Sequence, residues 1–198
     1  MDTLFKQLSS QLSGELHIDS LHRHIYATDA SVYRKIPQAV AYPKDTRDIQ
    51  RLVLFAKENN TTLIPRTAGT SLAGQCVGDG IIVDVSKHFT EIIHLDIEKR
   101  QITVQPGVIR DELNAFLKPH GLFFGPNTST ANRCMIGGMV GNNSSGTTSI
   151  KYGVTRDKIV QLKTVLSDGS EVTFESLSQL RFREKCQLST LELSLIHI

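Results

Sequence analysis

Residues 65–75, called the first loop below, combine small side chains, hydroxyl groups and one arginine in a pattern typical of phosphate binding. Glycine allows positive φ, and small side chains let a ligand approach the main chain closely. Successive N–H groups in such a turn form a concave surface that binds anions. Arg66 supplies the one full positive charge in this loop, and Thr67, Thr70 and Ser71 supply hydroxyl donors.

Two common nucleotide-binding motifs do not fit this region. Gly69 and Gly74 have the spacing of a P-loop, but Gln75 and Cys76 replace the lysine and the serine or threonine that would contact phosphates and magnesium. Residues 78–80 begin a dinucleotide-binding motif, but an apolar run follows in place of the third glycine and its helix. A phosphate loop without these ligands suits a pyrophosphate diester better than a phosphate that is transferred.

Residues 125–148, called the second loop below, are rich in Gly, Ser, Thr and Asn and exceed the length of an ordinary connection. An apolar centre at residues 135–140 divides the polar flanks. Such a segment can pack one side on the core and present backbone donors and acceptors on the other, which suits a flat heteroaromatic ligand. A plain surface loop is the alternative interpretation of both loops.

Cysteine and histidine spacing does not indicate a metal site. Cys76, Cys134 and Cys186 are widely separated and lack CxxC spacing, which suits a reducing compartment and supports no disulfide framework. His22 and His24 do not share a helix face, so we expect surface histidines and assign no metal ligand.

Asp84 is the one carboxylate inside a continuous apolar run, residues 81–85. Because a buried carboxylate needs hydrogen-bond partners, we expect a satisfied structural residue here rather than a catalytic base.

The elements around the loops alternate between strand and helix, which predicts an α+β architecture of two layers or two lobes. Leucines at every fourth position predict an N-terminal helix whose apolar stripe extends to Leu16. Asp45 gives an N-cap signal for a helix that stops at residues 59–60. A further helix begins near residue 109, carries Phe116 on its apolar face, and ends near Gly121. Predicted strands cover residues 39–42, 63–65, 81–85, 92–95, 101–104, 159–166 and 171–174.

Composition is that of an ordinary globular chain of 198 residues, with 39% hydrophobic and 21% charged residues. Lys and Arg number 22 and Asp and Glu number 20, which gives a net charge of +2. Because a dedicated nucleic-acid binder is usually strongly basic, this near balance of charge gives no support to that function. The apolar runs are far shorter than a membrane span, and the first residues lack the layout of a secretory signal. We therefore expect a cytoplasmic protein without a transmembrane segment, and leave peripheral membrane association open.

Together the two loops resemble the FAD-binding domain of the vanillyl-alcohol-oxidase/p-cresol-methylhydroxylase flavoproteins, and among them the FAD-linked D-lactate, glycolate and D-2-hydroxyglutarate dehydrogenases. The first loop is similar to P-R-G-G-G-T-S-x-x-G-Q, with Thr67 and Ala68 in place of two glycines. The second motif is matched by Pro126, Ser129, Cys134, Ile136, Gly137, Gly138, Asn143, Gly146, Tyr152, Gly153, Arg156 and Asp157. The resemblance covers residues 20–176, most of the chain.

The resemblance implies a two-lobed FAD-binding domain of the p-cresol-methylhydroxylase type at residues 25–176, with lobes at about 25–88 and 89–176. Residues 1–24 are then an N-terminal helix and connector. We expect residues 177–198 to be a truncated connector that ends in a non-native tail, because the last six residues resemble a translated sequencing adapter.

The resemblance also implies which residues bind FAD. The first loop would hold the pyrophosphate, the second would line the ADP and isoalloxazine, and Ile159 would offer backbone to the adenine end. Some members attach FAD through a histidine where Thr70 stands here, so we expect non-covalent FAD. Cys134, which could be a redox thiol or a flavin link, is expected to be a small packed residue. The implied residues are Arg66, Thr67, Ala68, Gly69, Thr70, Ser71, Gln75, Pro126, Asn127, Ser129, Cys134, Ile136, Gly137, Gly138, Asn142, Asn143, Ser144, Gly146, Tyr152, Gly153 and Ile159.

The implied activity is oxidation of a D-2-hydroxy acid by hydride transfer from Cα to FAD. The base and the carboxylate-binding cations lie mainly in a following substrate domain in this family, so no catalytic residue is assigned, and we expect an N-terminal fragment of a longer enzyme. The electron acceptor is open. An iron–sulfur module is one candidate, since residues 26–33 are similar to a segment of the large dehydrogenases that carry one.

Two other functions stay open at this point. The chain could be a stand-alone flavin-binding electron-transfer subunit that works with a separate substrate chain. It could also be a nucleotide-binding regulatory module that uses no flavin.

Overall fold

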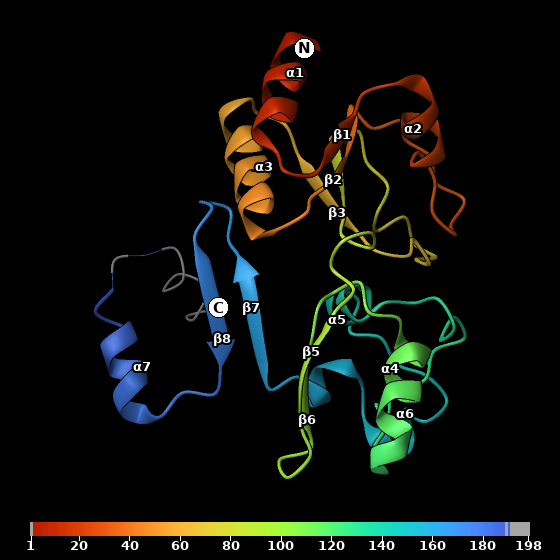
Figure 1. The fold of residues 1–198 in the computed structure, drawn as a ribbon, viewed down its shortest axis with the longest axis vertical. Helices are drawn as coiled ribbons and strands as arrows, with labels where there is room; N and C mark the ends of the chain where they lie inside the picture. Colours follow the sequence, from red (N-terminus) through yellow and green to blue (C-terminus); the bar gives the residue numbers. More distant parts are fainter. Residues whose placement is uncertain (1, 189, 191–198) are drawn as a thin grey trace.

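A computed structural model describes residues 2–188 and 190 and has mixed helix and strand (Figure 1). The first half builds a four-stranded sheet in the order β1-β2-β4-β3, from β1 (Glu15–His17), β2 (Ala39–Tyr42), β4 (Ile81–Asp84) and β3 (Leu63–Arg66). β2, β4 and β3 are parallel, and β1 runs antiparallel to β2. All four residues of β4 are buried, as expected for a central parallel strand.

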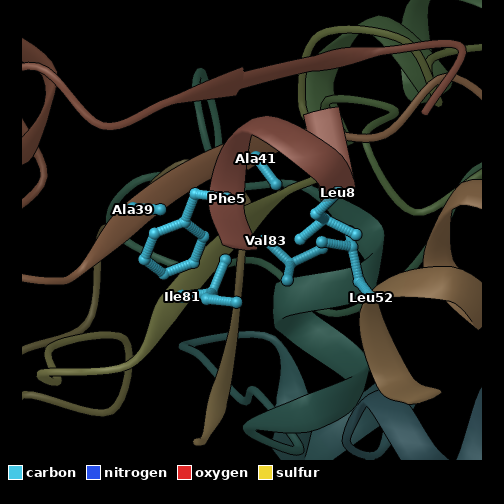
Figure 2. Close-up of a cluster of buried hydrophobic side chains, with 7 residues drawn as sticks. All are labelled: Phe5, Leu8, Ala39, Ala41, Leu52, Ile81 and Val83. Carbon is cyan, nitrogen blue, oxygen red and sulfur yellow. The ribbon is translucent and has the colours of Figure 1, made fainter. Parts of the chain in front are cut away.

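Two helices pack together beside this sheet, α1 (Asp2–Gln11) and α3 (Thr46–Glu58). The predicted N-cap of α3 is confirmed, since the Asp45 side chain accepts a 2.9 Å hydrogen bond from the Asp48 N–H. Figure 2 shows the buried cluster that unites helices and sheet. It consists of Phe5, Leu8, Ala39, Ala41, Leu52, Ile81 and Val83.

The N-terminal segment differs from the predicted helix and connector. The helix ends at Gln11, and Leu16 lies in the short strand β1 rather than on a helical stripe. A second helix, α2 (Ser20–Ile25), follows β1. Gly14 explains the change of direction, because a Cβ there would lie 2.1 Å from the Tyr42 carbonyl oxygen, so only glycine lets β1 approach β2.

The second half has its own buried cluster around α4 (Arg110–Leu117), which continues as the 3-10 turn η1 (Lys118–His120) before Gly121. The cluster consists of Val108, Leu113, Leu117, Cys134, Ile136 and Met139. The antiparallel pair β5 (Ile92–Asp96) and β6 (Gln101–Val104) packs against it through partly buried side chains. Phe116 is 43% exposed, so the prediction that it lies on the buried face of this helix is wrong.

The second loop is not free of secondary structure. It contains α5 (Ile136–Gly141), and α6 (Ser149–Tyr152) and the 3-10 turn η2 (Thr155–Lys158) follow it. The predicted hairpin is confirmed in β7 (Gln161–Val165) and β8 (Glu171–Glu175). A helix, α7 (Gln179–Lys185), occupies part of the predicted connector, while the predicted non-native tail at 193–198 lies outside the described residues.

The β7–β8 hairpin reaches back to the first half of the chain (Figure 1). Gln50 Nε2 on α3 donates a 2.8 Å hydrogen bond to the carbonyl oxygen of Gly169 at the hairpin turn. Leu54 packs near the same glycine, which has a φ of 83°. The lobe boundaries at residues 88 and 89 remain a prediction.

Candidate functional site

The first loop begins where two parallel strands end side by side. Arg66, the last residue of β3, is paired in register with Asp84, the last residue of β4. Tyr26 lies between them, because its hydroxyl donates a 2.5 Å hydrogen bond to Asp84 Oδ2 and its ring lies 4.9 Å from the Arg66 guanidinium carbon. Burial and the bond to Asp84 raise the pKa of Tyr26, so the phenol stays protonated.

Arg66 has a structural role in this arrangement. Its Nη1 donates a 2.8 Å hydrogen bond to the Thr28 carbonyl oxygen while the guanidinium covers the Tyr26 ring. An arginine has five N–H donors, so others stay available to an anion. The structure therefore adds a scaffold contact that the sequence interpretation of Arg66 missed. Tyr26, at the start of segment 26–33, was the sequence signal that could have indicated this contact.

Asp84 is a satisfied structural carboxylate, as predicted. It is 3% exposed, accepts from Tyr26 through Oδ2 and accepts a 2.7 Å hydrogen bond from the Ser86 N–H through Oδ1. Both oxygens are thus engaged inside the protein.

The turn of the first loop is shaped by two glycines and a serine. Gly69 and Gly74 have φ values of 66° and 71°, a left-handed conformation that suits glycine. The Ser71 hydroxyl bonds to the Gln75 side-chain oxygen and accepts from the backbone N–H groups of Ala73 and Gln75 at 3.3 and 3.2 Å. These local bonds hold the turn compact.

Residues 29–31 support the first loop from outside. The Ala30 N–H donates a 3.1 Å hydrogen bond to the Gly69 carbonyl oxygen, and Asp29 contacts the Cys76 thiol at 3.6 Å. Burial raises the pKa of Cys76, which keeps the thiol protonated and unreactive.

The start of α5 is fixed by tertiary backbone bonds rather than left open to a ligand. The N–H groups of Ile136 and Gly137 donate to the carbonyl oxygens of Val108 and Pro106 at 2.9 and 2.8 Å. Cys134 is 5% exposed and its sulfur lies 3.2 Å from Thr128 Oγ1, which fits the expected packed residue. Cys134, Ile136 and Gly137 therefore position the second loop by packing.

The two loops meet at two points. A Cβ built on Gly138 would lie 2.6 Å from Thr67 Oγ1, so the glycine allows α5 to approach the first loop. Gln75 Nε2 donates a 2.7 Å hydrogen bond to Asn142 Oδ1. The structure thus brings together residues that the sequence assigned to one site from distant segments.

Residues 143–146 are held in place partly by hydrogen bonds from η2. The Asn143 side-chain oxygen accepts a 3.0 Å hydrogen bond from the Arg156 N–H, and the Ser144 carbonyl oxygen accepts from the Thr155 hydroxyl at 2.7 Å. Gly146 crosses the Asn127 carbonyl so closely that a Cβ there would lie 1.6 Å from the oxygen. These residues link both ends of the second loop.

The remaining predicted residues vary in exposure. Pro126 is fully buried and its carbonyl oxygen accepts from Arg110 Nε at 3.1 Å, whereas Ser129 is exposed. The Tyr152 ring meets the Phe123 ring edge-on at 5.0 Å, and Gly153 has a φ of 75°. Ala68, Thr70 and Ile159 are half-buried.

The junction of the two loops combines small residues, polar side chains and a nearby cation. The exposed Gly138 lies beside the half-buried Thr67, and the exposed Asn142 is bonded to Gln75, so small residues and polar side chains meet at the junction. Residues 66–71 add hydroxyl donors and one cation next to it. This donor set suits an anionic pyrophosphate that joins two ring systems.

The two joined loops are the segments that the sequence motifs assigned to a flavin, and comparison with known proteins shows the class of the domain. The FAD binding domain family matches residues 37–175, and the chain belongs to this family. Its fold is the p-cresol-methylhydroxylase type of FAD-binding domain. Alkyldihydroxyacetonephosphate synthase superposes with a TM-score of 0.78 at 20% identity, covering 99% of this chain and 37% of that one. For 6-hydroxy-D-nicotine oxidase from Arthrobacter nicotinovorans the TM-score is 0.71 at 22% identity, covering 83% and 36%.

Among curated relatives, D-2-hydroxyglutarate dehydrogenase of Pseudomonas putida is 39% identical over 181 residues, which cover 90% of this chain and 18% of the relative. Glycolate oxidase subunit GlcD of Bacillus subtilis is 36% identical over 168 residues, which cover 83% of this chain and 36% of the relative. The chain therefore spans about a fifth to a third of the curated relatives it matches. Among the described residues, no helix has the length and apolarity needed to cross a bilayer.

Proposed function

We propose that this chain forms the FAD-binding part of a flavoenzyme that oxidises a D-2-hydroxy acid of the D-lactate, glycolate or D-2-hydroxyglutarate class. The proposal is supported by membership of the FAD-binding family and by relatives with those three activities in their names. The observation that carries it is the junction of the loops at Thr67 and Gly138 and at Gln75 and Asn142.

In the proposed enzyme, the residues of this chain bind FAD and set its orientation. The hydroxyls of Thr67 and Thr70, with the remaining donors of Arg66, would hold the pyrophosphate, while Ser71 keeps the turn compact and the second loop would line the ring systems. Bound FAD would supply the hydride acceptor for oxidation at the hydroxy-acid Cα. The base for the hydroxyl proton and the cations for the carboxylate belong to a substrate domain of the parent enzyme.

Titration of the purified chain with FAD, FMN and ADP-ribose tests the binding proposal. We expect one equivalent of FAD to bind with a flavin absorption spectrum and a quenched flavin emission, with FMN and ADP-ribose binding more weakly. A colourless protein that ignores added FAD would overturn the proposal.

Acid precipitation of the loaded protein tests the mode of attachment. Because Thr70 offers no imidazole for a covalent bond, we expect the flavin in the supernatant. A yellow pellet would contradict non-covalent binding.

Anaerobic reduction of the parent enzyme tests the substrate class. We expect D-lactate, D-2-hydroxyglutarate or glycolate to bleach the flavin. A parent enzyme that binds FAD but is bleached by none of the three would overturn the substrate assignment and leave flavin binding intact.

A further inference from the structure

Two imidazoles and a carboxylate lie together where β1 leads into α2, outside the residues assigned to FAD. β1 places Glu15 and His17 on the same face of the strand, because successive side chains alternate. Asp19 is the N-cap of α2, and its Oδ1 accepts a 3.1 Å hydrogen bond from the His22 N–H. This cap turns His22 back toward His17, and their rings stack with centroids 3.8 Å apart.

The ligand atoms of these three side chains have spacings close to those of a metal site. Asp19 Oδ2 lies 2.8 Å from His22 Nδ1 and 3.7 Å from His17 Nδ1, and one ligand atom from each residue lies within 4.8 Å of the others. Tetrahedral zinc with bonds of about 2.0–2.2 Å needs its ligand atoms about 3.3–3.6 Å apart. The distances from Asp19 Oδ2 to the two histidine Nδ1 atoms lie on either side of that range.

A second carboxylate, that of Glu15, lies at the other ring nitrogen of His17. His17 Nε2 lies 3.2 Å from Glu15 Oε2, and the other oxygen of Glu15 bonds to Lys87. A proton on Nε2, donated to Glu15, leaves the Nδ1 lone pair of His17 facing Asp19. Such a carboxylate commonly supports a histidine that ligates a metal, since it fixes the tautomer and raises ligand basicity.

The site is open enough for the rings to adjust. The side chains of His17 and His22 are 28% and 30% exposed, and the ring planes differ by 14°. Stacked rings must rotate until each plane contains the shared ion. The Tyr42 ring meets both rings edge-on, at 5.5 and 6.4 Å, and forms one wall of the site.

We propose that His17, Asp19 and His22 bind one divalent transition-metal ion of the zinc type, with water in the remaining position. Two imidazole ligands select such an ion over magnesium and calcium, which prefer oxygen ligands. The expectation of surface histidines without a metal role rested on His22 and His24, and His24 does not belong to this site. His24 bonds instead to the Ser20 carbonyl oxygen at 2.7 Å, and the signal was the spacing His-x-Asp-x-x-His.

Metal titration of the full chain without a polyhistidine tag tests this proposal independently of FAD. The Cys186→Ser background removes an exposed thiol that could also bind zinc. After treatment with a chelator, we expect one equivalent of Zn²⁺ to bind by calorimetry, Co²⁺ to give the visible absorption of a tetrahedral site, and Mg²⁺ and Ca²⁺ not to bind.

Variants assign the ligands. His17→Gln, His22→Gln and Asp19→Asn should each lower Zn²⁺ affinity at least tenfold, while His94→Gln, at an exposed histidine on β5, should leave it unchanged. Asparagine is a good N-cap, so Asp19→Asn keeps α2 capped while it removes the anionic ligand. Unchanged affinity in these three variants would overturn the proposal.

A measurement on the unaltered side chains covers the case in which a variant fails to fold. Paramagnetic Co²⁺ should broaden the imidazole NMR signals of His17 and His22 before those of the other histidines. Broadening that is equal across all histidines, or absent, would also overturn the proposal.

Discussion

Gln75 and Asn142, 67 positions apart in the chain, are joined by a 2.7 Å hydrogen bond from the Gln75 amide to the Asn142 side-chain oxygen. Both residues are exposed, so the bond adds little to global stability, but it fixes the distance between the loops. Preorganised loops lose less freedom when a ligand binds. The bond therefore concerns cofactor affinity more than folding.

Gln75→Ala and Asn142→Ala should each weaken FAD binding about three- to tenfold, which corresponds to roughly 0.5–1.5 kcal/mol for one hydrogen bond. Urea unfolding should change little. The double variant should lose no more than either single variant in fluorescence titration. Asn132→Ala, at an exposed asparagine of the same loop, is the control and should bind like the parent. Additive losses would contradict a direct Gln75–Asn142 coupling.

Gly138→Ala should greatly reduce FAD binding, because its Cβ would lie 2.6 Å from Thr67 Oγ1 and push the loops apart. The second substitution Thr67→Ala removes that oxygen, and the next nearest Thr67 atom is 3.9 Å away, so the double variant should regain affinity up to the level of Thr67→Ala alone. Gly141→Ala is a matched control on the same helix with nothing within 4 Å, and it should be neutral or slightly stabilising. Failure of Thr67→Ala to restore binding would show that the contact is not the cause.

Asp48→Asn should destabilise the first half of the chain by about 2–3 kcal/mol. Burial opposes the charge of Asp48, but backbone N–H groups of Lys44, Ser13 and Gly14, each at 2.9 Å, and nearby Arg51 outweigh it and lower its pKa. The folded pKa lies below the unfolded value, so this stabilisation is present above the unfolded pKa and is lost as pH falls through the folded pKa.

Urea unfolding across pH measures the Asp48 effect. The deficit of Asp48→Asn should be constant from neutral pH to just above the ordinary aspartate pKa of about 4 and should shrink below it. Glu112→Gln, at an exposed carboxylate, should show no such deficit. A deficit that grows toward acid would contradict the assigned direction.

Tyr26→Phe and Tyr26→Leu should separate two roles of one side chain. Phenylalanine removes the bond to Asp84 and should cost about 1–2 kcal/mol of stability, yet it keeps a ring under Arg66. Leucine also removes the ring, so it should weaken FAD binding about threefold relative to Tyr26→Phe, in line with a cation–π contact of about 0.5–1 kcal/mol. Tyr33→Phe, at an exposed tyrosine, serves as the control. Equal FAD affinity in the two Tyr26 variants would contradict the cation–π role.

The sequence predicted the elements whose signals are local. The Asp45 cap and the buried run at 81–84 depend on adjacent residues, and both are confirmed. The helix α5 could not be predicted, because Gly137 and Gly138 have low helix propensity and tertiary bonds to Pro106 and Val108 hold the segment. β1 was missed for a similar reason, since Leu16 continues a helical spacing while its pairing partner, Ala41, lies 25 positions further on.

For the site, residue types predicted which segments meet but not how each residue acts. The junction of the first and second loops agrees with the motif interpretation. Arg66 was assigned to a phosphate from its charge alone, while its contact with Thr28 and Tyr26 depends on a segment that precedes it by about forty positions. Such contacts are set by tertiary packing, which spacing within a motif does not encode.

The hydrogen bond between Gln50 and Gly169 joins α3 to a hairpin that the ribosome synthesises much later. The core of α1, α3 and the parallel strands consists of residues 5–83 and can collapse while the chain is still growing. The side of α3 that receives the hairpin turn, however, stays uncovered until residue 169 has left the ribosome, 119 positions after Gln50. Leu54 is 42% exposed even with the hairpin in place, so we expect nascent chains that end before the hairpin to expose it further and to depend on chaperones more than chains that include the hairpin.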